Sequence, residues 1–589
     1  MASFIFPGPE SYGQNVPAQP APSSVSREAV TGGDFINLLL LSELALYEKE
    51  DDVRDCAGRL IERAEKLEDA SLRRLLVFSL SKIMNAPENK RAVCAEHMGK
   101  IGEHFFQIAS DARKGNRNED ALAAVQIALR CAPANAEARL LFASLIEPKA
   151  ALQTLHYGIQ FLNLESDIAP AYFNRYFGAL ADLQQDRIAA KQALALLGGK
   201  TDDGKDALPP AVRTAVANHA AMSLFWIGEY AAALKILEDE KIDATQQGLI
   251  LKSRCLFDMR RSREAIALLG SKVNEFPAAK RDVILSQLAH FHQYLGDFSS
   301  ALDATNRRIE ENPTAPQPYL HRLYLLDRLG KQEAFDEEIA AVFKTFSAQQ
   351  SALLSLANFS AENGNPAIAE TCAAIAVEKK FPPNIFVAAA IEALVTAKQV
   401  EQAIDTYQKM SKSSPKIFEG VESAVTAILS AAYTVAAEKA AAGGDSESQD
   451  RFAGHAELLL GQFLADETLS AENYISVSAL FERVGQTNAA LQVAQAGLTA
   501  FPWHAQLRAN TISLRMRCNQ VLGSASQTPL SKEIRALASM RRPNPKIWSE
   551  IAQFLNSTAA LPPQEIAALK KIVTPLVRDD LNLDAMRGF

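Results

Sequence analysis

Apolar residues recur at helical spacing along most of the chain, and many of them are alanines. The segments 388–397 and 424–437 are the clearest examples. Alternation of apolar and polar positions, which marks a half-buried strand, is scarce. The pattern therefore predicts an essentially all-α chain.

A second pattern is a fixed spacing of small residues and proline. In Gly296–Ala301–Pro313 a glycine precedes an alanine by five positions, and a proline follows twelve positions later. A second complete copy consists of Gly485, Ala490 and Pro502. Residues at these places also recur at a step of 34, namely Ala301, Phe335, Ala369 and Ala403, and likewise Gly296, Gly330 and Gly364. A repeat of this size predicts a solenoid built of similar units.

Each place in the pattern has a physical reason. The glycine ends the first helix of a pair, where a positive φ is often required. The alanine lies where two helices cross closely, and the proline cannot continue the preceding helix. Weaker copies keep the alanine and the proline but replace the glycine by Asn116, Arg260 and Lys398.

The spacing resembles that of the tetratricopeptide repeat family, most clearly over 213–416 and 470–505 and more weakly near 100–165. The resemblance implies an all-α, right-handed α-solenoid of helix–turn–helix repeats with atypical helical ends. It also makes the binding of other proteins the expected activity.

The register divides the chain into five parts. We expect a disordered Pro-rich tail at 1–33, a helical region with diverged repeats at 34–212, and the central array at 213–416. Helical repeats after an interruption follow at 417–522, and a linker with capping helices fills 523–589. The interruption predicts a bend or a domain boundary, because the alanines on its two sides are not separated by a multiple of 34.

In a tetratricopeptide-like unit, the first helix of each pair lines an inner groove. Equivalent groove positions here are Arg254, His290, Tyr324 and Asn358, with Gln293, Tyr294, Asp327, Arg328 and Glu362 as neighbours on the same face. Tyrosine and arginine are enriched in interface hot spots. We therefore expect a protein-binding groove for an extended peptide or a partner helix, against the alternative of ordinary solvated helix surface.

The amino-terminal tail carries a second candidate. Its apolar tip, Phe4, Ile5 and Phe6, is followed by Tyr12. The segment is either an unstructured terminus or a short docking motif for a partner or for the solenoid itself.

One activity of the family is not expected. Members that bind the C-terminal tails of heat-shock chaperones use a clamp of Lys, Asn and Arg on the first helices. Asn358 fits the asparagine, but Leu354 stands at the lysine place. The next unit presents Ala388 and Glu392 where the clamp needs a cation or an asparagine.

The sequence offers no catalytic, cofactor or metal site. It lacks HExxH, a phosphate-binding loop and GxGxxG. His290 and His292 are two residues apart and so lie on different faces of a helix, and this spacing argues against a shared metal. We expect a non-enzymatic scaffold, adaptor or chaperone, with two alternatives: a self-assembling structural subunit, and a helical-repeat accessory arm of an enzyme complex.

Charge and cysteine content bear on the class of partner and on the cellular compartment. The net charge of −8 argues against nucleic acid as the partner. Two local basic groups, 260–263 and 541–542, are expected to be solvated, or else to contact a phosphate or an acidic peptide. The six cysteines form no CxxC pair, and neither a signal peptide nor a membrane span is apparent, so we expect a cytoplasmic protein. The alanine-rich composition looks bacterial, and by analogy alone we expect a role in a secretion or assembly apparatus.

Overall fold

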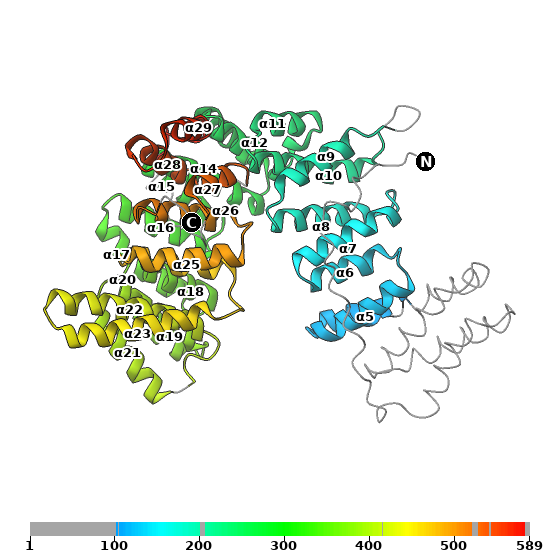
Figure 1. Ribbon diagram of the computed structural model, residues 1–589. Coiled ribbons are helices and arrows are strands. Elements are labelled where there is room, and N and C mark those ends of the chain that lie inside the picture. Colours follow the sequence, from blue (N-terminus) through cyan, green and yellow to red (C-terminus); the bar gives the residue numbers. More distant parts are fainter. Residues whose placement is uncertain are drawn as a thin grey trace, which may run out of the picture. The chain divides into compact units, whose positions relative to one another are not determined.

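A computed structural model describes most of the chain beyond the first hundred residues, over 102–103, 105–200, 206–414, 416–520, 528–540 and 544–582. Within these ranges the chain is helical (Figure 1), and the single extended pairing is a bridge between Lys200 and Asp206. The predicted all-α solenoid of helix–turn–helix units is confirmed. The tail 1–33 and its candidate docking residues Phe4, Ile5, Phe6 and Tyr12 lie outside the described residues, as does the whole of 34–101.

The chain divides into two compact units, Met1–Ala220 and Ala221–Phe589, and we describe each by itself. The described helices that begin in unit 1 are α5 (Asn118–Cys131), α6 (Ala136–Leu145), α7 (Pro148–Gly158), η3 (Ile159–Phe161), α8 (Ala169–Asp182), α9 (Asp186–Leu197) and α10 (Pro210–Trp226). Helix α10 runs across the division. The core of this unit is aromatic: Tyr172 and Phe173 of α8 are buried, and the Tyr172 hydroxyl donates a hydrogen bond to the Leu155 carbonyl at 2.8 Å.

Unit 2 begins with a regular series of helix pairs. Its helices up to the break in register are α11 (Tyr230–Asp239), η4 (Ile242–Ala244), α12 (Gln246–Asp258), α13 (Ser262–Lys272), η5 (Val273–Glu275), α14 (Ala278–Tyr294), α15 (Phe298–Glu311), α16 (Pro316–Arg328), α17 (Gln332–Phe346), α18 (Gln350–Glu362), α19 (Pro366–Glu378), α20 (Pro383–Thr396) and α21 (Val400–Ser413). Each even-numbered helix from α12 to α20 is the first of a pair.

The helices after the break complete unit 2. They are α22 (Glu422–Ala442), α23 (Ser446–Leu464), α24 (Ala471–Arg483), α25 (Thr487–Ala500), α26 (Ala505–Arg517), α27 (Leu530–Ala538), α28 (Lys546–Ser557), α29 (Pro563–Val573) and η6 (Thr574–Leu576). In Figure 1 the last of these helices return to lie beside α12 and α14.

The turn inside each pair has the backbone that the spacing predicts. The glycines at this place have φ between 63° and 92°; they are Gly228, Gly296, Gly330, Gly364 and Gly485. The three places that lack glycine keep the same conformation, with φ of 59° at Asn116, 63° at Arg260 and 60° at Lys398. The repeat geometry therefore persists where its most recognisable residue is missing.

The small residue of the pattern is buried in every described copy. The alanines at this place are fully buried, namely Ala121, Ala233, Ala265, Ala301, Ala369, Ala403 and Ala490. The structure adds a copy that the sequence pattern missed, since Gln184 has a φ of 51° and Ala189, five positions later, is 1% exposed. The α8–α9 pair therefore has the same turn, without the glycine that would have revealed it.

The break in register is a pair of longer helices. Helices α22 and α23 contain 21 and 19 residues, whereas the α-helices before them in unit 2 contain 10 to 17 residues. Asp445 caps α23 by accepting a hydrogen bond from the amide of Ser448, and a tight turn at 443–445 joins the two helices. One hydrophobic cluster runs from Val387 to Leu514 through this pair, so the core is continuous across the break.

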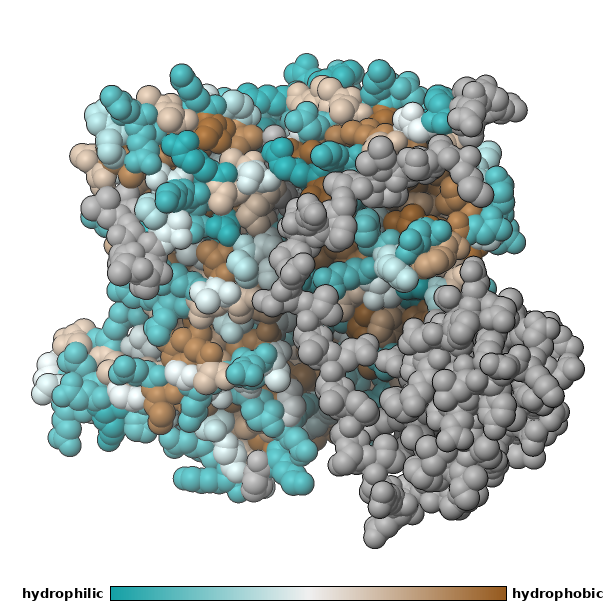
Figure 2. Space-filling model, turned by 45° about the vertical axis from the view of Figure 1, so that its right-hand side comes forward, coloured by the Kyte–Doolittle hydropathy of each residue, from teal (hydrophilic) through white to brown (hydrophobic). Residues whose placement is uncertain are grey.

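None of the described helices is both long enough and apolar enough to span a bilayer. On the face in Figure 2, hydrophilic residues are interspersed with smaller apolar areas. Large exposed apolar side chains such as Val377 and Leu458 lie on separate helices, as on ordinary surfaces.

Candidate protein-binding surface

The structure places the predicted groove residues on four successive first helices. Arg254 lies on α12, and His290, Gln293 and Tyr294 lie on α14. Tyr324, Asp327 and Arg328 lie on α16, and Asn358 and Glu362 lie on α18. The other faces of these helices supply the hydrophobic core, to which Leu256, Leu285, Leu323 and Leu356 belong. We call the side of α12, α14, α16 and α18 that carries the nine residues the inner surface.

Gln293 lies beneath this surface rather than on it. Only 1% of its area is exposed, and its Oε1 lies 2.7 Å from Nε2 of His321. The His321 ring in turn stacks on His290, with 5.1 Å between the ring centroids. Gln293 therefore connects α14 to α16 and offers little area to a partner.

The two stacked histidines are neutral at pH 7. Burial lowers the pKa of His290 to about 4, and the nearby Arg308 and Arg254 add to the shift. Burial, together with His290 and Arg308, lowers the pKa of His321 to about 3. His290 and His292 take different partners, since His292 lies 3.2 Å from a carboxylate oxygen of Asp297. Over the described part of the chain, no group of three or more His, Cys, Asp or Glu could hold a metal ion.

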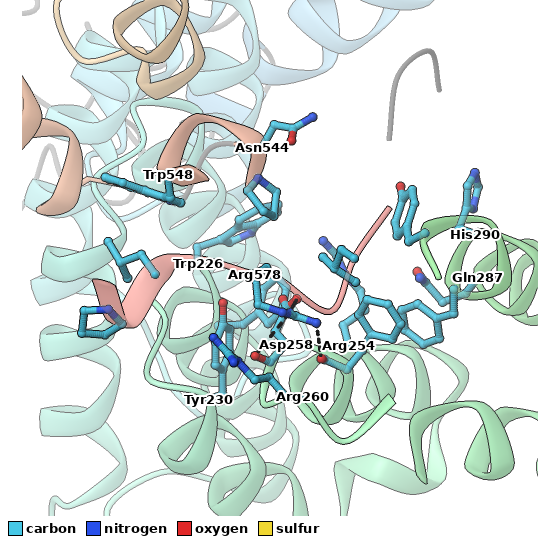
Figure 3. Close-up of a pocket in the computed structure, with 18 residues that line it drawn as sticks. Trp226, Tyr230, Arg254, Asp258, Arg260, Gln287, His290, Asn544, Trp548 and Arg578 are labelled. Carbon is cyan, nitrogen blue, oxygen red and sulfur yellow. Dashed lines mark hydrogen bonds and ion pairs between the residues drawn. The ribbon is translucent and has the colours of Figure 1, made fainter. Parts of the chain in front are cut away.

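Three of the predicted residues meet in one cavity. Arg254, His290 and Tyr294 line a space of about 440 Å³, which Figure 3 shows with Trp548 on its far side. The guanidinium carbon of Arg254 lies 4.6 Å from the ring centroid of Phe225 and 5.3 Å from that of Trp226. The cavity therefore combines a cation with aromatic walls.

The remaining predicted residues line the surface beyond this cavity. Tyr324 is half-buried and close enough to Tyr294 to raise its pKa, although burial is the largest cause of that shift. Asp327 and Asn358 are exposed. Arg328 is exposed and lies over the ring of Phe298, with its guanidinium carbon 5.4 Å from the centroid.

The far end of the inner surface is acidic. Burial raises the pKa of Glu362, and the positive charge of Arg483 opposes the shift. Burial also raises the pKa of Glu392 on α20, which accepts a hydrogen bond from Arg483 at 2.6 Å. Sequence reasoning placed Glu392 on the groove face but missed Arg483, because α24 lies far away in the chain and comes close only through the curvature of the array.

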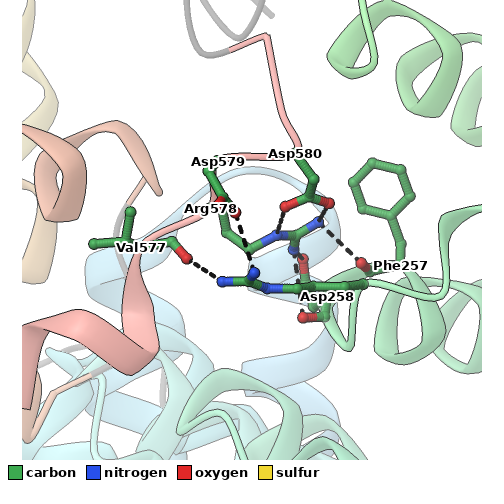
Figure 4. A network of polar contacts seen from close by, with 7 residues as sticks. Phe257, Asp258, Val577, Arg578, Asp579 and Asp580 are labelled. Atoms are coloured by element: carbon green, nitrogen blue, oxygen red, sulfur yellow. Dashed lines mark hydrogen bonds and ion pairs between the residues drawn. The ribbon is translucent and has the colours of Figure 1, made fainter.

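Sequence reasoning also missed a segment that closes unit 2 onto itself. Residues 577–582, here called the C-terminal strap, lie against α12 and α14. Arg578 donates hydrogen bonds to the carbonyl oxygen of Phe257 at 3.1 Å and to Oδ1 of Asp258 at 3.2 Å (Figure 4). The amide of Asn582 donates to the Tyr294 carbonyl at 2.7 Å. Two predicted groove helices are thus already partly covered by the chain itself.

The strap supplies partners for a basic group noted in the sequence. Arg260 was expected in a solvated loop or in contact with an acidic peptide, and it is half exposed and pairs with Asp579 of the same chain at 3.1 Å. Asp580, the next residue of the strap, pairs with Arg578 at 2.7 Å. The opposite charges of 260–263 and 579–580 were the available signal, but charge alone does not identify a partner several hundred residues away.

No protein-family model and no curated protein matches the chain. Among solved structures, it is similar to the APC/C hetero-tetramer Cut9–Hcn1, with 12% identity and a TM-score of 0.25 over 80% of this chain and 96% of that one. It is also similar to Naa15/Naa10 bound to HypK-THB, with 11% identity and a TM-score of 0.26 over 92% of this chain and 100% of that one. Identities and scores this low carry no argument about what the present chain binds.

Proposed function

We propose that the chain is a non-enzymatic protein-interaction scaffold that binds a partner peptide or helix on the inner surface of unit 2. One observation carries the proposal: side chains from successive repeats, chosen from the repeat register alone, converge on a cavity. Arg254, His290 and Tyr294 come from two helices and line the same space. Concave sites with aromatic walls and few polar groups are the usual form of a binding site.

The distribution of charge along the inner surface favours an extended, oriented ligand. Arg254 stands at the α12 end, whereas Glu362 and Glu392 stand at the α18–α20 end, with Arg483 as their cation. Neighbouring packed helices are about 8–10 Å apart, so the path from α12 to α18 is roughly 30 Å. An extended peptide covers this length with about nine residues. We infer a segment with an acidic residue near one end and a basic residue near the other.

Further parts of the role are proposed from the sequence. We place the scaffold in the cytoplasm, with proteins rather than nucleic acid as partners, and propose an adaptor or chaperone role in a bacterial secretion or assembly apparatus. Self-assembly through the repeats and service as the arm of an enzyme complex are the alternative functions. Phe4, Ile5, Phe6 and Tyr12 are proposed as an additional docking segment.

A capture experiment with two matched variants tests the proposal. The inner variant changes Arg254→Gln, Tyr324→Ala and Glu362→Gln on the inner surface. The outer variant changes Asp303→Asn and Arg307→Gln, which are exposed on the second helix α15. Both full-length proteins are first compared with wild type by circular dichroism and thermal melting, and then used to capture partners from an extract of the source organism.

The proposal predicts that a partner captured by wild type is lost with the inner variant and kept with the outer one. If every captured protein survives the inner changes, the inner surface is not the binding site. Light scattering over a concentration series addresses self-assembly, since a mass that rises with concentration and falls in the inner variant would favour a second copy as the ligand.

A further inference from the structure

The cavity in unit 2 has walls from distant parts of the chain. Helices α12 and α14 form one side, and α28, η6 and the C-terminal strap form the other. Its volume of about 440 Å³ is within the usual range of ligand sites, roughly 300–1,000 Å³. Aromatic rings of Trp226, Tyr294 and Trp548 contribute to its lining. A planar or apolar group can therefore be enclosed on several sides.

The cations around the cavity differ in how they are paired. Arg578 is paired with Asp258 and Asp580, and Arg260 is paired with Asp579. Across the described residues, Arg254 forms no ion pair, and its guanidinium lies over the rings of Phe225 and Trp226. Arg254 is therefore the arginine of the lining that no carboxylate contacts, although the two carboxylates beside Arg578 balance the total charge around the cavity.

The surroundings hold the guanidinium of Arg254 ready for an anion. Stacking against two aromatic rings fixes the plane of the group, which reduces the conformational freedom that is lost on binding. A planar guanidinium matches a carboxylate through two parallel hydrogen bonds. His290, in the same lining, is neutral because of its burial, so it adds hydrogen-bonding capacity without adding charge.

We propose that this cavity binds a carboxylate that is carried beside an aromatic or large apolar group, with Arg254 as the anion-binding residue. The inference rests on the proposed function, since it names the ligand chemistry at one end of the inner surface. The carboxylate has two possible sources in a peptide, an Asp or Glu side chain or the terminal carboxylate. Either source places the apolar neighbour against Trp226 and Trp548.

Three small probes separate these sources and measure the role of the charge. N-acetyl-phenylalanine carries a terminal carboxylate, N-acetyl-Phe-Glu-amide carries a side-chain carboxylate, and N-acetyl-phenylalanine amide carries none. Binding of each to the full-length chain is measured by ligand-observed NMR and calorimetry. From typical ligand efficiencies, the better carboxylate probe is expected to bind with a Kd on the order of 1 mM. The neutral amide is expected to bind roughly tenfold to a hundredfold more weakly.

Variants assign the effect to Arg254. Arg254→Gln is expected to reduce binding of the carboxylate probes to the level of the neutral amide. Arg254→Lys is expected to give an intermediate loss, because the positive charge remains but the two parallel hydrogen bonds of the guanidinium are lost. Arg307→Gln on α15 removes an exposed arginine outside the cavity and is expected to leave binding unchanged. Should Arg254→Gln fail to fold, the comparison of charged and neutral probes on wild type still decides the matter.

The inference is overturned if the neutral amide binds as well as the carboxylates, or if folded Arg254→Gln binds them like wild type. These failures leave the proposed function standing when a partner is still captured through Tyr324 and Glu362. The opposite combination is also informative. If wild type binds the carboxylate probes but the inner variant still captures every partner, the cavity is a ligand site and the inner surface is not the partner-binding site.

Discussion

The C-terminal strap offers the sharpest test of the structure, through the substitution Arg578→Ala. Only 8% of the Arg578 side chain is exposed. The side chain reaches Oδ1 of Asp258, Oδ1 of Asp580 and the Phe257 carbonyl. Its removal leaves the two carboxylates and a buried carbonyl oxygen without their cation. Truncation of one partner of a buried ion pair usually costs about 3–5 kcal/mol.

Arg260→Ala is the matched control. Arg260 contacts the same strap through Asp579 and the Val577 carbonyl, but its side chain is 49% exposed and that of Asp579 is 79% exposed. Exposed ion pairs contribute about 0–1 kcal/mol because solvent screens them. The two variants therefore remove contacts to the same segment at very different expected cost.

Hydrogen exchange followed by mass spectrometry measures how much each variant weakens the attachment of the C-terminal strap. The amide of Asn582, which donates to the Tyr294 carbonyl, reports attachment of the strap. A loss of about 3–5 kcal/mol corresponds to an exchange rate about a hundredfold to several thousandfold higher in Arg578→Ala. Arg260→Ala should raise the rate by less than about fivefold. Equal acceleration in the two variants, or none in Arg578→Ala, would refute the reasoning from burial.

Three further predictions concern the repeats. Gly330→Ala should lower the free energy of unfolding of unit 2 by about 1–2 kcal/mol in urea; no atom crowds an added Cβ, so the cost comes from the φ of 66° alone. Lys398 has a φ of 60°, so Lys398→Gly should raise the free energy of unfolding by up to about 1 kcal/mol. Ala301→Leu should cost about 1–3 kcal/mol, measured in the same way, since the site is fully buried at a helix crossing. The free energy of unfolding should fall as pH falls from about 6.5 towards 4, because His290 and His321 bind protons in the unfolded chain but stay neutral in the folded one. Each histidine contributes a slope of up to about 1.4 kcal/mol per pH unit, so the slope should be smaller in His321→Gln. A free energy of unfolding that does not change with pH would contradict the assignment.

The part of the fold that could be predicted is the part set by neighbours in sequence. A turn residue, a crossing residue and a helix-ending proline lie within one unit, so their spacing alone predicted the close crossing at Ala301, which is fully buried, and the positive φ at Gly296. The α8–α9 pair escaped because Gln184 supplies the same turn conformation without a recognisable residue. Propensity at one position is a weak guide when the surrounding packing fixes the backbone.

The candidate site depends on contacts between units, which the repeat register does not show. The register assigned Gln293 to the groove face of α14, but it could not show that His321 of the next unit would bury Gln293. Nor could it show that the C-terminal strap would reach α12, or that Arg483 would approach Glu392, since both contacts depend on how far the array curves. Curvature is the sum of small rotations between units, and no single residue reports it.

The central claim is that the inner surface of unit 2 is the surface that binds a partner. Its most direct test is a photo-crosslinking amino acid placed at Tyr324, between the cavity and the acidic end, and separately at Val377, which is 63% exposed on the second helix α19. The account predicts a discrete crosslinked partner from position 324 that disappears with Arg254→Gln and Glu362→Gln, and none from position 377. The same partner crosslinked equally from both positions, or from position 377 alone, would contradict it.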